Sequence, residues 1–266
     1  VLASVPLSYQ ASLTALSLTR GYSRTKGNEI IAIADPVFSI NDARLNRPTE
    51  SSTAEQNPLN RLRLSASEAA SLEQLAPDRT RVFTGFDAKV ARLAPDALAE
   101  VSILHLATHG FADDDTPART GVMLSLFDKN GNPQAGFLGL RDIYELRLDS
   151  ELVTLSACET ALGQQLAGEG LLGLTRGFMY AGARRVVASL WPVSDRATAE
   201  LMQHFYQAML EDGLTPDAAL AHAKRKLSEN RRFRHPYYWA AFVLHGDWRP
   251  LEGAGEIIDT PATAGR

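Results

Sequence analysis

The sequence predicts an α/β fold in which helices cover both faces of a mostly parallel sheet. Short apolar, β-branched runs alternate with amphipathic helical segments along the 266 residues. Each run is apolar at nearly every position, which is typical of strands buried on both faces. Hydrophobic residues make up 45% of the chain, enough for a large core. In such sheets ligands bind at the carboxyl ends of the strands, so that edge should carry the functional residues.

The first half of the chain follows this alternation. The run NEIIAIADPVF (28–38) is predicted to be a strand that ends at Asp35-Pro36. The polar stretch 39–66 is long for a connection, which is typical of functional or mobile loops. Ser65 and Glu68 fit a capping box for the next helix. The remaining elements are a helix over 65–76, a strand over 80–85, helical turns over 86–100, a strand over 101–110, and a hairpin over 121–140 that turns at Asn130-Gly131.

The second half begins with LVTLSACETALG (152–163), an apolar strand that ends near the only cysteine of the chain. Ser194 and Thr215 fit the N-caps of two helices, and Gly182 fits the end of a third. The predicted elements are helices over 168–183, 194–213 and 215–230, a strand over 184–191 that stops at Pro192, and a final strand over 238–246.

Composition excludes several classes of function. The net charge is −4 and the basic residues are scattered, which argues against nucleic acid or a membrane surface as partner. No apolar run approaches the roughly 20 residues that span a bilayer. A single cysteine cannot form an internal disulfide, so we expect a reducing compartment, the cytoplasm. Because the chain starts at Val1, we expect it to be a fragment or processed product.

His109 and Cys158 are the residues that could carry chemistry. Each falls where a predicted strand ends, so both project from one edge of the sheet if the two strands are neighbours. An imidazole beside a thiol can activate it as a nucleophile. His109 precedes Cys158 by 49 residues, close to the spacing of about 50 found in caspases. The alternative is that Cys158 is a buried small hydrophobe and His109 a hydrogen-bonded loop residue.

Five motifs in order resemble the CHAT domain, a branch of the caspase-like peptidases commonly joined to tetratricopeptide repeats. They are HLATHGF, LVTLSACETALG, GEGLLGLTRGFMYAGARRVVASLWPVSD, ATAELMQHFYQAM and HPYYWAAFVLHGDW. The resemblance covers roughly residues 29–249, which leaves 1–28 as the remnant of an upstream region and 250–266 as a flexible tail. It implies a caspase-like three-layer sandwich with His109 as general base and Cys158 as nucleophile. The caspase pattern Q-A-C-[RQG]-G is not met, so aspartate specificity is not implied.

Acyl transfer would also need donors for an oxyanion and a place for substrate. The backbone N–H groups of Gly110 and Cys158 are the candidate donors, although Gly110 could equally be a turn glycine. By the resemblance, substrate would lie extended against VASLWPV (187–193), near Ser189 to Trp191. Trp191 could equally be a core aromatic.

Three carboxylates could line the pocket for the residue before the cut. They are Asp35, Asp195 and Glu169, and together they would favour Arg or Lys. Each also has an ordinary structural reading. Asp35 could cap the turn at Pro36, and Asp195 and Glu169 could sit in first helical turns, where negative charge is favoured.

The sequence thus predicts a cysteine endopeptidase that cleaves protein substrates without cofactor or metal, under control of upstream tetratricopeptide repeats or a regulatory protein. His105 could suggest a metal pair with His109, but four residues of strand span about 13 Å, too far for one ion. We expect His105 to be buried. Two alternatives remain: a catalytically silent CHAT scaffold or signalling module, and a hydrolase of non-peptide amides or esters.

Overall fold

A seven-stranded sheet forms the centre of the computed structural model, which describes residues 5–10, 27–45, 59–111, 116–156 and 169–251. The strand order is β1-β10-β9-β8-β4-β2-β3, and every adjacent pair is parallel except β10 with β9. This confirms the mostly parallel sheet. The strands are β1 (Ser8–Tyr9), β2 (Glu29–Pro36), β3 (Thr80–Gly85), β4 (Val101–Ala107), β8 (Leu152–Leu155), β9 (Arg185–Ser189) and β10 (Phe242–Gly246).

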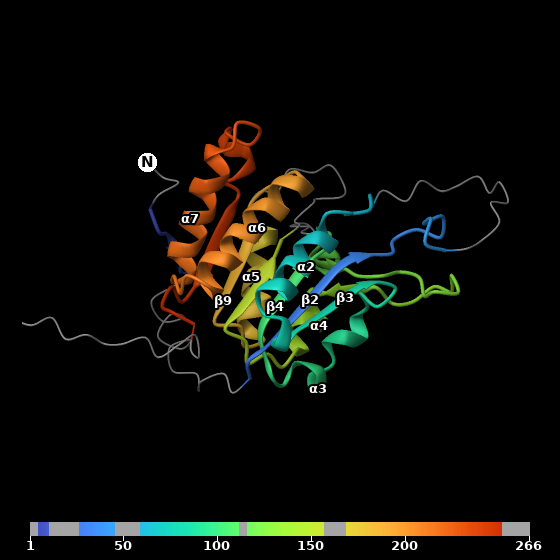
Figure 1. Cartoon of the computed structure of the whole chain (residues 1–266). Helices are drawn as coiled ribbons and strands as arrows, with labels where there is room; N and C mark the ends of the chain where they lie inside the picture. Colours follow the sequence, from blue (N-terminus) through green and yellow to red (C-terminus); the bar gives the residue numbers. More distant parts are fainter. Residues whose placement is uncertain (1–4, 11–26, 46–58, 112–115, 157–168, 252–266) are drawn as a thin grey trace, which may run out of the picture.

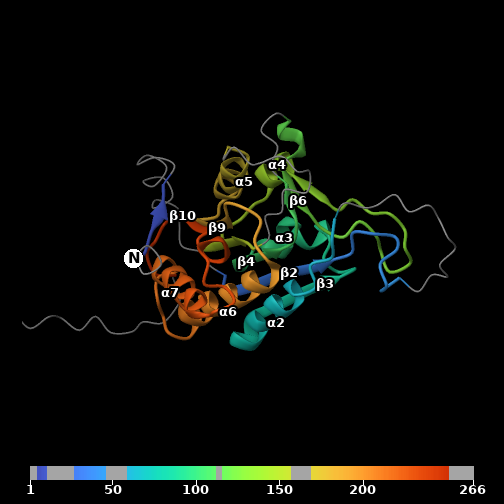
Figure 2. The same cartoon turned by 90° about the horizontal axis from the view of Figure 1, so that it is seen from above.

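Helices cover both faces of this sheet, as predicted (Figures 1 and 2). Seen from above in Figure 2, α2, α6 and α7 lie on one side of the strands, and α3, α4 and α5 lie on the other. The helices are α2 (Ser65–Leu75), α3 (Pro95–Leu98), α4 (Leu140–Glu145), α5 (Glu169–Tyr180), α6 (Asp195–Leu210) and α7 (Pro216–Glu229), and short 3-10 turns span Pro77–Arg79, Val90–Leu93, Pro117–Arg119 and Pro236–Tyr238.

Strand β2 shows why its run is continuously apolar. Ile30 and Ala32 point into the core beneath α2 and α6, while Ile31 and Ile33 point into the core on the opposite face. All four side chains are fully buried. Alternation along a strand therefore supplies both cores at once, and a polar side chain at any of these four positions would be costly.

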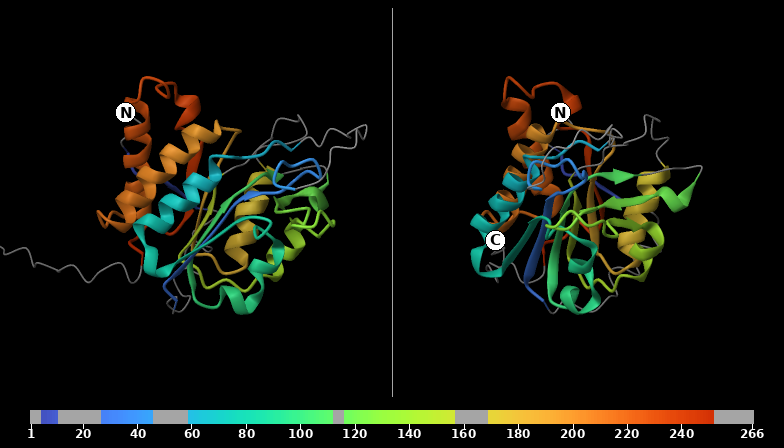
Figure 3. Two further views of the ribbon diagram at one scale, coloured as in Figure 1. Left: turned by 45° about the vertical axis from the view of Figure 1, so that its right-hand side comes forward. Right: turned by 90° about the vertical axis from the view of Figure 1, so that its right-hand side faces the viewer.

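A small second sheet lies next to the carboxyl end of β4. It consists of β5 (Gly110–Phe111), β6 (Gly121–Met123) and β7 (Phe137–Gly139), paired antiparallel in that order. The predicted hairpin is thus present, and Gly131 adopts the positive φ of 76° that its turn requires. Because β5 directly follows β4, this sheet fixes the course of the chain just beyond His109. Figure 3 shows the large sheet and the small hairpin from the side.

Ser194 and Thr215 occupy the N-cap positions of α6 and α7, and Gly182 follows α5 with a positive φ of 117°, as predicted. The capping box predicted at Ser65 and Glu68 is wrong, because Leu64 is the N-cap of α2. No side-chain cap hydrogen bond forms at the starts of α2, α6 or α7. Ser65 instead accepts a hydrogen bond from the backbone N–H of Asp35 at 2.8 Å, and Glu68 turns toward His105. Thr215 donates to Asp217. These side chains find partners on other elements or within their own turn, which sequence spacing alone does not reveal.

Two described elements were not predicted. Helix α4 follows the hairpin directly, and Ser8–Tyr9 forms the edge strand β1, paired with Leu244 and His245 of β10. Strand β1 lies within residues 1–28, the segment expected to precede the domain. A two-residue strand leaves too short a pattern to recognise in sequence.

Candidate active site

Strands β4 and β8 are parallel neighbours at the middle of the sheet. Leu155 pairs with Leu106, 49 positions earlier, and His105 pairs with Thr154 in the same register. The carboxyl ends of the two strands therefore meet at one edge, which confirms the predicted adjacency. Cys158 lies outside the described residues, and Ser156 is the last described residue before it.

His109 is fully buried at this edge, two residues beyond β4. Its Nε2 lies 2.6 Å from the backbone carbonyl oxygen of Asn60, and its ring lies 4.9 Å from that of Phe38. A carbonyl oxygen only accepts hydrogen bonds, so Nε2 carries a proton. Nδ1 is consequently the ring nitrogen that could accept a proton from a thiol. The sequence analysis missed Asn60, because its backbone rather than its side chain makes this contact.

Gly110 begins β5 and pairs with Val122 of β6. The N–H of Met123 donates to the carbonyl of His109 at 2.8 Å, which makes Gly110 and Val122 a non-hydrogen-bonded pair of the antiparallel ladder. At such a position the N–H of Gly110 points away from β6. It is therefore available as a donor toward the side opposite the hairpin.

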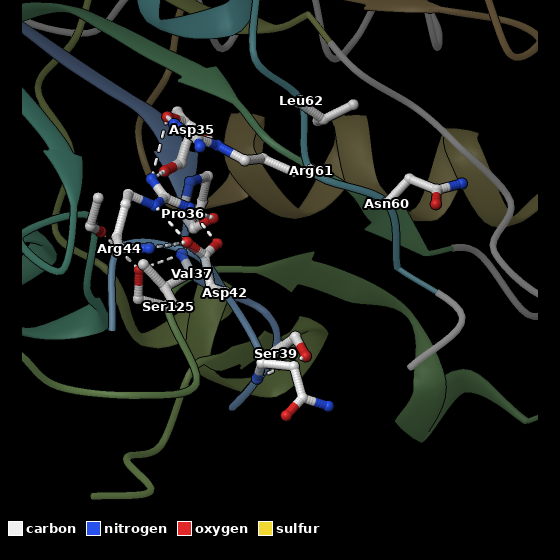
Figure 4. A network of polar contacts seen from close by, with 12 residues as sticks. Asp35, Pro36, Val37, Ser39, Asp42, Arg44, Asn60, Arg61, Leu62 and Ser125 are labelled. Atoms are coloured by element: carbon white, nitrogen blue, oxygen red, sulfur yellow. Dashed lines mark hydrogen bonds and ion pairs between the residues drawn. The ribbon is translucent and has the colours of Figure 1, made fainter. Parts of the chain in front are cut away.

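Asp35 lies at the carboxyl end of β2 and is 4% exposed. Figure 4 shows its carboxylate held by two arginines. Arg61 donates from Nε at 2.8 Å and from Nη2 at 2.6 Å, and Arg44 donates from Nη1 at 3.0 Å. The Asp35 carboxylate raises the pKa of Arg61. The charge of Asp35 is thus balanced within the chain, and this residue is not a lining residue of the nearby pocket.

A pocket of about 300 Å³ opens at the same edge of the sheet. It lies between the segment that leads into α2, the end of β8 and the turn from β9 into α6. Its lining residues are Asn60, Arg61, Leu62, Ser65, Glu68, Ser156, Ser189, Pro192, Val193, Ser194, Asp195 and Thr198.

Asp195 is the half-buried carboxylate of this pocket. Its Oδ2 accepts the backbone N–H of Leu64 at 2.9 Å, and no basic side chain among the described residues forms an ion pair with it. Burial raises the pKa of Asp195, and the nearby carboxylates of Glu68 and Asp35 act in the same direction. A cation that entered the pocket would favour the charged form of Asp195 and so lower its pKa again.

Glu68 provides a second carboxylate in the pocket, which is buried and contacts His105. Its Oε1 lies 2.7 Å from Nε2 of His105, whose Nδ1 lies 2.9 Å from the hydroxyl of Tyr206. Tyr206 donates in turn to Thr154 at 2.8 Å. Burial raises the pKa of Tyr206, so its hydroxyl stays protonated. His105 is fully buried, as predicted, and it connects the pocket to the core between β4 and α6.

The other predicted substrate-binding residues fall in different places. Ser189 is buried at the end of β9 and lines the pocket. Trp191 does not line it; the indole N–H donates to the carbonyl of Tyr237 at 2.9 Å, and the ring packs against the core. Glu169 begins α5, but its side chain lies outside the described residues. Ser156, which the sequence analysis missed, is buried, and its Oγ has no hydrogen-bond partner among the described residues.

The described part of the chain holds no group of three or more His, Cys, Asp or Glu side chains placed to bind a metal ion. None of its helices combines the length and apolarity needed to cross a membrane.

Solved structures with the same arrangement of sheet and helices define the class of fold. The Saccharomyces cerevisiae separase in its complex with securin superposes with a TM-score of 0.54 at 13% identity, over 92% of this chain and 14% of that one. The Arg-specific cysteine proteinase gingipain R gives 0.51 at 13% identity, over 90% of this chain and 52% of that one. The fold is therefore a caspase-like α/β sandwich.

The sequence model of the CHAT domain matches residues 1–247, and this chain belongs to the CHAT domain family. Tetratricopeptide repeat protein 28 of Mus musculus is 37% identical over 122 residues, and its Homo sapiens counterpart is 34% identical over the same length. That segment covers 46% of this chain and 5% of each relative. The chain thus resembles one small part of much longer repeat proteins.

Proposed function

We propose that this domain is a cysteine endopeptidase in which His109 activates Cys158. The observation that carries the proposal is the register of β4 and β8, in which paired residues stand 49 positions apart, the separation of His109 and Cys158. If the segments that follow β4 and β8 continue in that register, the imidazole of His109 and the thiol of Cys158 lie side by side. The contact of Asn60 with Nε2 supports this proposal, because it leaves Nδ1 to serve as the base.

In the proposed reaction the Cys158 thiol gives its proton to His109, and the thiolate attacks the scissile carbonyl carbon. Charge develops on the carbonyl oxygen, where the N–H groups of Gly110 and Cys158 would receive it. The imidazolium then gives its proton to the leaving amine as the C–N bond breaks. Water hydrolyses the resulting thioester and restores the thiol. No step needs a cofactor.

We propose that the pocket accepts an Arg or Lys side chain before the cut. Asp195 supports this preference, because it is a half-buried carboxylate without an ion-pair partner among the described residues. Glu68 adds negative charge nearby, and Ser156 offers a hydroxyl at the pocket wall. Of the three carboxylates expected from sequence, Asp195 is the one we keep for substrate; Asp35 already binds two arginines.

Protein substrates and regulation through tetratricopeptide repeats are part of the same proposal. The matched relatives are named for such repeats, and the matched solved structures include a complex of separase with securin. We propose that repeats or a partner protein complete the pocket and that this domain alone is latent. With one cysteine and no disulfide to protect, it suits a reducing compartment, and we propose the cytoplasm.

A peptide panel tests the proposed activity. The peptides differ only in the residue before the cut, which is Arg, Lys, norleucine or Asp, and each is offered to the wild type and to Cys158→Ala. We expect cleavage after Arg and Lys that is lost in the variant. Cleavage after norleucine in preference to Arg would contradict the basic pocket.

The same panel separates the alternatives. A folded domain that cleaves no peptide, with or without a tetratricopeptide repeat partner, would support the silent scaffold. Turnover of p-nitrophenyl esters without peptide cleavage would support hydrolysis of non-peptide substrates. The Cys158→Ala variant controls for contaminating peptidases in every case.

A further inference from the structure

We infer that Asp35 and Arg61 form a clamp that positions the catalytic base, although Arg61 also lines the pocket. Arg61 is the residue next to Asn60, whose carbonyl holds Nε2 of His109. The two-point contact of Arg61 with Asp35 therefore fixes the chain at the position where it touches the imidazole. This inference rests on the proposed function of His109.

The clamp has the geometry of a strong interaction. Both oxygens of the Asp35 carboxylate receive a donor from the Arg61 guanidinium, at 2.8 and 2.6 Å. A planar fork that binds both oxygens holds its partner in orientation as well as in distance. The Asp35 side chain is 6% exposed and the Arg61 side chain 34%, so the carboxylate is shielded from water while the guanidinium is partly open to it.

Asp35 is itself held firmly. Its backbone has a positive φ of 46°, a left-handed conformation that Asp tolerates better than most non-glycine residues. Ser65 accepts its N–H at 2.8 Å, and Arg44 donates to its carbonyl oxygen at 2.8 Å. Arg44 is fixed in turn by Asp42. Figure 4 shows Asp35, Arg44 and Asp42 in one network at the end of β2.

The segment that carries Asn60 depends on such anchors. Residues 60–64 are held by three contacts: the Asn60 carbonyl on His109 just beyond β4, the Arg61 side chain on Asp35 in β2, and the Leu64 N–H on Asp195 at the start of α6. If the Arg61 anchor is removed, the Asn60 carbonyl loses its fixed position. A freed carbonyl no longer stabilises the protonated Nε2, so the imidazolium that pairs with the thiolate becomes less favourable.

The test is the rate at which iodoacetamide alkylates the full chain between pH 5.5 and 9.5. Cys158 is the only cysteine, so mass spectrometry counts its modification without ambiguity. We expect the wild type to react at pH 6.5 because an imidazolium lowers the pKa of the thiol. Arg61→Ala and Asp35→Asn should each slow the reaction at pH 6.5 by about tenfold or more, with little change at pH 9.5.

Two further variants keep the test specific. Arg61→Lys retains the charge without the fork and should restore part of the rate, and the double variant Arg61→Ala/Asp35→Asn should be no slower than either single one. The control is Arg81→Ala, which removes an exposed ion pair with Glu29 at the opposite end of β2. Its rate profile should match that of the wild type.

Several results would overturn the inference. One is a folded Arg61→Ala variant whose rates stay within about twofold of the wild type at every pH. Another is spontaneous cleavage of the chain between Arg61 and Leu62, which would make Arg61 a substrate residue. If Cys158 of the wild type is alkylated like an ordinary thiol and His109→Ala does not change the rate, the proposed His109–Cys158 dyad is wrong. The inference about the clamp is then wrong as well.

Discussion

The backbone N–H of Leu64 donates to the carboxylate of Asp195 at 2.9 Å and so joins two segments 131 residues apart. This contact ties the approach to α2 to the start of α6, and the pocket lies between them. Asp195 is held in the wall by a backbone group that carries no net charge. Among the described residues no basic side chain forms an ion pair with Asp195, which is why we propose that it binds a basic side chain of the substrate.

Asp195→Asn should weaken the preference for basic substrates. The amide keeps the shape and can still accept from Leu64, but it removes the negative charge. We expect the ratio of kcat/KM for Arg over norleucine peptides to fall by about tenfold to a hundredfold, the range for a lost hydrogen bond to a charged group. Asp212→Asn, at an exposed position after α6, is the matched control and should leave the ratio unchanged. An unchanged ratio in Asp195→Asn would remove this residue from the pocket.

The preference for Arg should also depend on pH. Burial raises the pKa of Asp195 above its ordinary value of 3.8, so its carboxylate becomes protonated at a higher pH than an exposed one. The ratio of kcat/KM for Arg over norleucine peptides should therefore have its highest value near neutral pH. It should decline as the pH falls, with a midpoint above 3.8. Taking the ratio cancels the titration of the dyad, which affects both peptides alike. A ratio that stays constant down to pH 4 would contradict the assignment.

Tyr206→Phe should destabilise the domain. The hydroxyl of Tyr206 connects His105 to Thr154 in a fully buried position, and its removal leaves both without that partner. Such a loss costs about 1–3 kcal/mol in the free energy of unfolding, measured by urea denaturation. Tyr144→Phe is the control, because Tyr144 is exposed on α4 and keeps its ring contact with Tyr180. Equal stability of the two variants would show that the chain of hydrogen bonds contributes nothing.

Glu151→Ala should lower the free energy of unfolding more than Tyr206→Phe does. Glu151 precedes β8, is 1% exposed, and lies 3.4 Å from Arg184 and 3.2 Å from the buried Arg185. Removal of the carboxylate leaves arginine charge buried, which costs about 3–5 kcal/mol. Glu145→Ala removes an exposed i,i+4 pair with Arg141 and should change stability by no more than about 0.5 kcal/mol. Chemical denaturation of both variants compares the two costs directly.

The fold could be predicted well from sequence because its signals are local. The apolar runs that became β2, β4, β8 and β9 are buried on both faces, and continuous burial leaves a clear mark on composition. The capping box at the start of α2 was mistaken because Ser65 and Glu68 find partners on other elements, at Asp35 and His105. Such long-range contacts leave no spacing signature in one sequence.

The site was predicted less completely than the fold. His109 was singled out because a histidine at a strand end stands out, and the structure places it two residues beyond β4. The Asn60 carbonyl could not be found, since every residue has one and only the fold brings this one to His109. Asp35 was correctly placed at the end of its strand, but its pairing with Arg61, 26 residues away, depends on the path of the intervening chain.

Labelling of the full chain by an arginyl acyloxymethyl ketone tests the central claim most directly. The reagent places an arginine in the pocket and reacts only with an activated thiolate. We predict that one molecule attaches to Cys158 in the wild type, assayed alone and with a tetratricopeptide repeat partner, and that His109→Ala abolishes the labelling. A folded wild-type protein that stays unlabelled in both settings, or a His109→Ala variant that labels equally fast, would contradict the account.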